Sequence, residues 1–158
     1  MVQKHLSIDY IEYESIDQLD KNDAQLINSA IEASKGSYAP YSKFNVGAAV
    51  RLDNGEIVSA SNQENAAFPS GLCAERVAVF YASAKYPEQS VDSIAIIALK
   101  DGQLLPTPTY PCGACRQVLA EYEQRGGRKM RILTGSGKVV QVFEGVASLL
   151  PFIFDNLK

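Results

Sequence analysis

Histidine and cysteine are scarce in this sequence, which has one histidine and three cysteines among its 158 residues. A structural zinc site uses four protein ligands, most often cysteine and histidine. The three cysteines could be completed to four only by His5, which stands in a polar N-terminal stretch. The composition therefore disfavours a closed structural zinc site. It leaves room for a site with three ligands and one open position, as in catalytic zinc centres.

Long apolar runs and a strong charge imbalance are missing as well. No run approaches the roughly 20 apolar residues that a membrane-spanning helix requires, and residues 1–20 contain no apolar stretch typical of a signal peptide. We therefore expect a cytoplasmic protein with no membrane partner, whose thiols stay reduced instead of forming a structural disulfide. The formal net charge of −3 gives no long-range attraction to phosphate backbones, so we expect no nucleic-acid partner.

Hydrophobic periodicity predicts a single α/β domain over residues 21–158, preceded by an arm, residues 1–20, that is either flexible or packed at an interface. No composition break marks a second domain. Helices are expected over residues 20–35, 73–85 and 113–126, and strands over 44–52, 56–61, 91–100, 128–134 and 138–144. This order predicts a three-layer α/β/α fold with a mixed five-stranded sheet and helices on both faces. The first two strands are expected to form an antiparallel hairpin, and right-handed crossovers to bring the later strands in parallel.

All three cysteines fall where a loop is expected to turn into a helix. Cys73 precedes the second helix, and Cys112 and Cys115 lie in "PCGAC" at the start of the third. Exposed backbone N–H groups and the helix dipole favour thiolates at such positions, and thiolates are zinc ligands. A Cys-x-x-Cys pair alone also fits a redox site, but a redox site would make no use of Cys73.

Two neighbours of Cys73 strengthen the interpretation as a metal site. Glu75 would lie within one helical turn of a metal bound there, where a carboxylate can take a proton from bound water and pass it to a substrate. Arg76 could donate to the sulfurs and offset the negative charge of three thiolates. Taken singly, Glu75 is typical of a solvated first-turn carboxylate and Arg76 of a surface residue. Their joint spacing favours a catalytic zinc site.

The combination of "CAE" with "PCGAC" resembles the zinc nucleoside deaminases, and specifically the small homotetrameric cytidine deaminases. The resemblance also includes "YAPYSKFNVGAAV", "NQENAAF" and the terminal "LLP", and it covers about residues 22–154. It implies a hydrolase that uses zinc-activated water to convert cytidine and 2′-deoxycytidine to uridine and 2′-deoxyuridine plus ammonia, in pyrimidine salvage. It further implies one zinc ion per subunit, a pyrimidine nucleoside as the small-molecule partner, and a homotetramer.

The resemblance also implies roles for individual residues. Cys73, Cys112 and Cys115 would hold the zinc ion, with Arg76 beside them, and Glu75 would shuttle protons. The implied substrate contacts are Phe44 against the pyrimidine ring, Asn62 and Glu64 at the ribose 3′-hydroxyl, the backbone N–H of Ala74 at the base carbonyl, and Phe154 closing the pocket from another subunit. Without the resemblance, Asn62 and Glu64 would be interpreted as turn-forming loop residues, and Phe154 as a packed terminal anchor.

Two alternatives stay open at this point. The substrate could be a modified cytosine nucleoside such as blasticidin S, and Phe68 occupies a position where many relatives have a tyrosine near the ribose 5′ side. A non-catalytic zinc module is the second alternative, against which the lack of a fourth ligand argues.

Overall fold

The structure is a computed structural model that describes residues 1–155. Within these residues the α-helices are α1 (Lys21–Ser34), α2 (Ala74–Lys85) and α3 (Gly113–Gly126). The strands are β1 (Ile11–Tyr13), β2 (Phe44–Leu52), β3 (Ile57–Ser61), β4 (Val91–Lys100), β5 (Gln103–Leu104), β6 (Arg131–Gly135) and β7 (Val140–Glu144). Short 3-10 helices lie at Ile16–Gln18, Phe68–Ser70 and Val146–Ser148. None of these described helices is long and apolar enough to cross a membrane.

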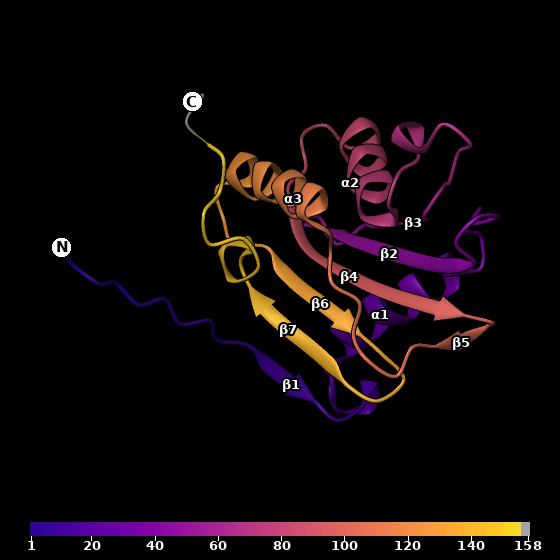
Figure 1. Ribbon diagram of the computed structural model, residues 1–158, viewed down its shortest axis with the longest axis horizontal. Helices are drawn as coiled ribbons and strands as arrows, with labels where there is room; N and C mark the ends of the chain where they lie inside the picture. Colours follow the sequence, from indigo (N-terminus) through magenta and orange to yellow (C-terminus); the bar gives the residue numbers. More distant parts are fainter. Residues whose placement is uncertain (156–158) are drawn as a thin grey trace.

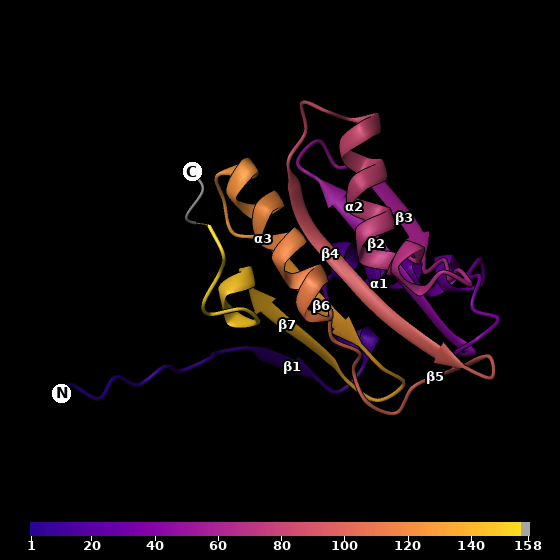
Figure 2. The same ribbon diagram turned by 45° about the horizontal axis from the view of Figure 1, so that its top comes forward.

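The strands form one mixed sheet in the order β1-β7-β6-β4-β2-β3, with β5 paired to β4. Helix α1 covers one face of this sheet, whereas α2 and α3 lie beside each other on the opposite face (Figure 1 and Figure 2). The predicted three-layer α/β/α fold is therefore confirmed.

The sheet differs from the sequence-based prediction in two respects. It has seven strands instead of five, because β1 and β5 are only three and two residues long and such short strands leave no readable periodicity. The prediction that the later strands run parallel holds only for β6 beside β4. Strand β4 is antiparallel to β2, and β7 is antiparallel to β6. The short turn 136–139 joins β6 to β7, and a connection this short can join only antiparallel neighbours.

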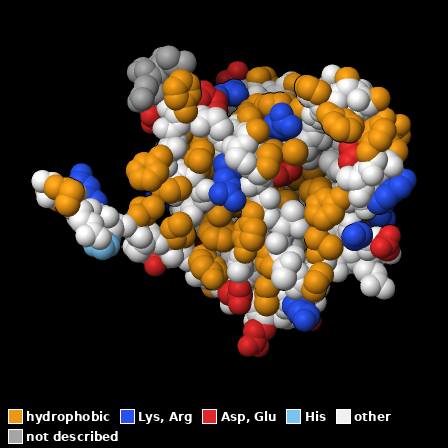
Figure 3. All heavy atoms as spheres, in the orientation of Figure 1, with side chains coloured by type: hydrophobic (Ala, Val, Ile, Leu, Met, Phe, Trp, Pro, Cys, Tyr) orange, Lys and Arg blue, Asp and Glu red, His pale blue; other side chains and the backbone are white. Residues whose placement is uncertain are grey.

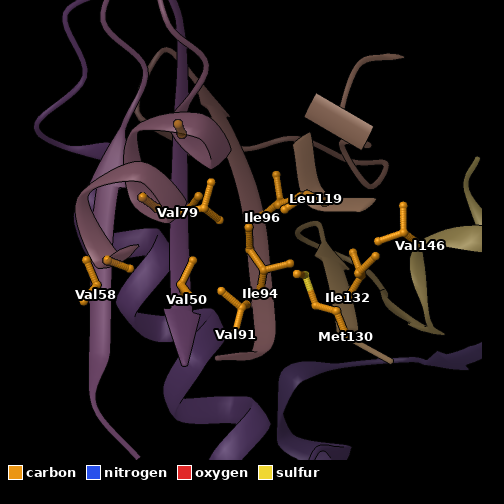
Figure 4. Close-up of a cluster of buried hydrophobic side chains, with 14 of the residues drawn as sticks. Val50, Val58, Val79, Val91, Ile94, Ile96, Leu119, Met130, Ile132 and Val146 are labelled. Atoms are coloured by element: carbon orange, nitrogen blue, oxygen red, sulfur yellow. The ribbon is translucent and has the colours of Figure 1, made fainter. Parts of the chain in front are cut away.

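Strand β4 is buried on both faces, as its continuous apolar run predicts. Ile94 and Ile96 point into the core beneath α2 and α3, where they pack with residues such as Leu119 (Figure 4). The alternate residues Ala95 and Ile97 belong to the second core, beneath α1. Because successive side chains of a strand point to opposite faces, β4 contributes side chains to the cores on both faces of the sheet.

Helix α1 approaches the sheet unusually closely at Gly47 of β2. A Cβ atom at this position would lie 1.9 Å from the carbonyl oxygen of Ala30 and 2.7 Å from the backbone nitrogen of Ser34. Backbone atoms cannot move aside as a flexible side chain can. Glycine is therefore required here by the close approach of another backbone.

We expect Gly47→Ala to lower the free energy of unfolding by about 3 kcal/mol, because α1 must move away from β2 to admit the methyl group. Denaturant unfolding followed by circular dichroism measures the change. Gly36→Ala is the matched control, since its nearest neighbours would lie at an ordinary 3.5 Å. Equal unfolding midpoints for the two variants would contradict the close packing of α1 on β2.

Candidate functional site

The sheet topology brings the N termini of α2 and α3 together. Helix α2 leads into β4, and α3 leads into β6. Because β4 and β6 are adjacent and parallel, two helices that return over the same face start at the same edge of the sheet. Cys73 and Cys112 are the N-cap residues of α2 and α3, and Cys115 follows within the first turn of α3.

The three thiols form one compact group. Their sulfur atoms all lie within 4.8 Å of one another, and none is in a disulfide. Three sulfurs bound at about 2.3 Å to one tetrahedral zinc ion would be roughly 3.8 Å apart, so a small adjustment of side chains suffices. Cys115 is buried, Cys73 is half-buried and Cys112 is exposed. One side of the group therefore stays open to a ligand.

The thiols are already electrostatically inequivalent. A hydrogen bond with Cys115 lowers the pKa of the Cys73 thiol to about 5. Burial of Cys73 raises this pKa, whereas the neighbouring Arg76 lowers it. The same hydrogen bond, together with burial, raises the pKa of Cys115 well above its ordinary value. The Arg76 Nη2 donates to the Cys73 sulfur at 3.8 Å. Its buried Nε has no partner among the described residues, so a second anionic group beside it would be stabilised. This donor set fits a zinc ion with three thiolate ligands.

Glu75 lies in the first turn of α2 and is only 4% exposed. Burial, reinforced by the negative charge of Cys73, raises the pKa of the Glu75 carboxyl above its ordinary value. Glu75 lines the same cleft as Cys73 and Cys112. A buried acid with access to a cleft can exchange a proton with a bound molecule.

The cleft beside the thiols has a volume of about 760 Å³. It brings together most of the residues that the sequence suggested, because Phe44, Asn62, Glu64, Cys73, Glu75, Arg76 and Cys112 all line it. Sequence reasoning did not single out Tyr41, Leu72 and Tyr110, which also line it. Position alone could have suggested Tyr110, which stands two residues before Cys112.

Asn62 and Glu64 shape the wall of the cleft. The Asn62 side chain accepts from the backbone N–H of Val46 at 2.8 Å and donates to the carbonyl of Phe44 at 2.9 Å. The Glu64 carboxylate accepts from the backbone N–H groups of Tyr41 and Ser42 at 2.9 and 3.3 Å. Hydrogen bonds from Ser42 and Tyr41 lower the pKa of Glu64. Both side chains thus hold the backbone around Phe44 in place.

Two of the expected contacts lie outside this lining. Ala74 is buried, and its backbone N–H opens α2, where helix N–H groups lack an intrahelical partner. Phe154 is 62% exposed and does not line the cleft of its own chain. Its backbone is held on α3 by Gln117, which donates to the Phe154 carbonyl at 2.8 Å and accepts from its N–H at 3.2 Å.

Comparison with known proteins gives one consistent result. Residues 20–126 match the family model described as the cytidine and deoxycytidylate deaminase zinc-binding region. Cytidine deaminase of Halalkalibacterium halodurans is 46% identical over 96 residues, which are 61% of this chain and 68% of that protein. Cytidine deaminase of Sporosarcina psychrophila is 37% identical over 132 residues, 84% of this chain and 90% of that protein. The crystal structure of cytidine deaminase from Burkholderia pseudomallei matches with a TM-score of 0.70 at 35% identity, covering 82% of this chain and 97% of that chain.

All three cysteines of the sequence lie in this group, so a thiol titration reports on the site alone. We expect the zinc-loaded protein to show no rapidly reacting thiol, and a chelator to release one zinc ion and expose three thiols per chain. Zinc is measured by atomic absorption and thiols with a chromogenic disulfide reagent. A protein that contains no zinc and forms a reversible Cys112–Cys115 disulfide would instead identify a redox site.

Proposed function

This chain belongs to the cytidine and deoxycytidylate deaminase family, and we propose that it hydrolyses cytidine and 2′-deoxycytidine to uridine and 2′-deoxyuridine with release of ammonia. Membership makes it a zinc-dependent hydrolase that acts on the C–N bond of a cyclic amidine. The observation that carries the proposal is the meeting of Cys73, Cys112 and buried Glu75 in the cleft that also contains Phe44. The reaction would serve pyrimidine salvage in the cytoplasm, where thiol ligands stay reduced.

In the proposed reaction the zinc ion would activate water, and the protein would transfer protons. Cys73, Cys112 and Cys115 would hold a zinc ion, which would act as a Lewis acid and lower the pKa of a water molecule. The proposed task of Glu75 is to move protons. It would take a proton from that water and pass it to N3 of the pyrimidine, which makes C4 electrophilic for attack by the remaining hydroxide oxygen. It would then carry the proton of the new C4 hydroxyl to the exocyclic amine, so that the C4–N bond breaks and ammonia leaves. Arg76 donates to the Cys73 sulfur and so limits the charge that three thiolates place beside the substrate.

The remaining contacts position the nucleoside. Phe44 lines the cleft at the start of β2, and its ring can stack on the flat base. Asn62 and Glu64 lie beside it. The Glu64 carboxylate can accept from the ribose 3′-hydroxyl, and the Asn62 amide can donate to it, while both also bond the backbone. The N–H of Ala74 is proposed to hold the base carbonyl, since donors at a helix start favour partial negative charge.

The central test compares the parent protein with Glu75→Gln, prepared identically and loaded with zinc. Loss of the proton shuttle is expected to lower kcat for cytidine by about 10²-fold to 10⁴-fold. The decrease in ultraviolet absorbance of cytidine and deoxycytidine follows the reaction. The matched control is Glu32→Gln on α1, whose exposed carboxylate pairs with the exposed Lys35.

The outcomes of this test are distinct. Equal rates for the parent and Glu75→Gln would remove Glu75 from the mechanism. Turnover of blasticidin S without turnover of cytidine would assign the chain to a modified cytosine nucleoside, with the exposed Phe68 at the cleft as the first residue to exchange for tyrosine. A zinc-loaded protein that deaminates none of these substrates would be a non-catalytic zinc module.

The proposal includes a homotetramer in which Phe154 closes the cleft of a neighbouring subunit. Two features support an assembly. Exposed aromatic side chains include Phe80 and Tyr81 on α2, as well as Phe152 and Phe154 near the C terminus. Hydrophobic side chains are also spread over the face shown in Figure 3. Because Gln117 fixes the backbone of Phe154 while its ring stays exposed, the ring is presented outward.

Subunit complementation tests this arrangement. Phe154→Ala is expected to raise KM for cytidine by about fivefold through loss of an aromatic contact. When the Phe154→Ala and Glu75→Gln chains are co-expressed, mixed oligomers should regain sites with parental KM, since each such site takes Glu75 from one chain and Phe154 from the other. Absence of regained sites would show that Phe154 does not act on the cleft of a neighbouring subunit. A monomeric mass by light scattering together with full activity would overturn the tetramer.

A further inference from the structure

The N-terminal strand β1 lies outside the region that matches the family model, which begins at residue 20. It extends the sheet at its edge by pairing antiparallel with β7, with Glu12 opposite Gln141 (Figure 1). Alternate residues of a strand share a face. The side chains of Tyr10 and Glu12 therefore lie next to those of Gln141 and Phe143.

A chain of hydrogen bonds leads from this strand to the cleft. The Gln141 side chain donates from Nε2 to the Glu12 carboxylate at 2.7 Å. Its Oε1 accepts from the hydroxyl of Tyr110 at 2.6 Å. Gln141 is only 8% exposed, and leaving one of its amide groups unpaired at such a buried position is costly. Glu12 therefore helps to fix the amide orientation that receives the Tyr110 hydroxyl.

Aromatic contacts run alongside these hydrogen bonds. The ring of Tyr10 stacks on Phe143, with centroids 5.3 Å apart and planes at 29°. The ring of Tyr110 meets the same Phe143 edge-on, at 6.3 Å and 73°. Phe143 is 4% exposed. The ring and the hydroxyl of Tyr110 are thus held by two side chains of β7, and both of these touch the N-terminal strand.

Tyr110 itself belongs to the candidate active site. It lines the cleft and stands two residues before Cys112. Since its hydroxyl is engaged with Gln141, the part of Tyr110 left for a bound molecule is its ring. A fixed ring loses little conformational entropy when a ligand packs against it.

We propose that the ring of Tyr110 contacts the substrate in the active site. Glu12 of β1 and Tyr10, which directly precedes β1, are its positioning residues and act through Gln141 and Phe143. The inference rests on the proposed nucleoside deaminase activity. It makes residues 10–13, outside the shared family region, part of the substrate-binding apparatus of this chain. The chain that precedes β1 extends away from the body of the molecule, whereas β1 itself lies along β7 (Figure 1 and Figure 3).

A double-mutant cycle on zinc-loaded protein tests the link between Glu12 and Tyr110. Glu12→Ala and Tyr110→Phe each remove one end of the hydrogen-bond chain. Either change is expected to raise KM for cytidine about threefold to tenfold, with kcat altered by less than about twofold, because one hydrogen bond that positions the ring is lost. The double variant is expected to be no worse than Tyr110→Phe alone, since Glu12 acts only through the tyrosine hydroxyl.

Glu14→Ala is the matched control. It removes the same side chain from the same segment, and Glu14 bonds Gln18 only through its backbone N–H. Parental KM is expected for this variant. If Glu12→Ala behaves like Glu14→Ala, or if the effects of Glu12→Ala and Tyr110→Phe multiply, the proposal is overturned. A lowered melting temperature with unchanged KM would likewise reduce Glu12 to a purely structural role.

A second readout does not depend on turnover. Hydrogen exchange of the peptide covering residues 105–112 is expected to be faster in Glu12→Ala than in Glu14→Ala. Should the parent protein fail to deaminate cytidine, the proposed function is wrong, and this comparison still decides whether the N-terminal strand restrains Tyr110. Equal exchange in the two variants would overturn that restraint even in a fully active enzyme.

Discussion

The parallel pairing of β4 with β6 is the constraint on which the site depends. Every other pair of neighbouring strands in the described sheet is antiparallel. Helices α2 and α3 precede these strands and lie on one face of the sheet (Figure 1), and the parallel pairing makes both begin at the same edge. Cys73 therefore meets Cys112 and Cys115, about forty residues further along the chain, with all three sulfurs within 4.8 Å of one another. A sheet with β6 reversed would place the N terminus of α3 at the opposite edge, far from Cys73.

The two converging helix N termini also affect the charges of the groups in the site. Thiolates accumulate negative charge, and the partial positive charges of two helix N termini lie beside them, together with the guanidinium of Arg76. Burial works in the other direction on Glu75, whose pKa it raises. Neighbouring groups are thus biased toward opposite protonation states, the thiol of Cys73 toward loss of its proton and the carboxyl of Glu75 toward retention. A site that must bind a cation and also transfer protons needs both tendencies.

The parts of this molecule that could be predicted from the sequence are those governed by local patterns. Loop-to-helix transitions at Cys73 and Cys112 follow from composition and periodicity, and the burial of β4 follows from its apolar run. Strand directions could not be inferred in the same way, because they depend on which strands become neighbours. The three-residue strand β1 is defined by its partner β7 and carries too few residues for a period. The role of Tyr110 depends on Gln141, thirty-one residues away, and no local pattern encodes that contact.

The proposed function requires that a zinc ion held by the three thiols makes this cleft a cytidine deaminase site. Its most direct test measures ammonia release from cytidine against zinc content, by adding zinc stepwise to metal-free protein from zero to one ion per chain. We expect the rate to rise in proportion to zinc occupancy and to level off at one zinc per chain. A rate independent of zinc, or no ammonia at full occupancy, would contradict it.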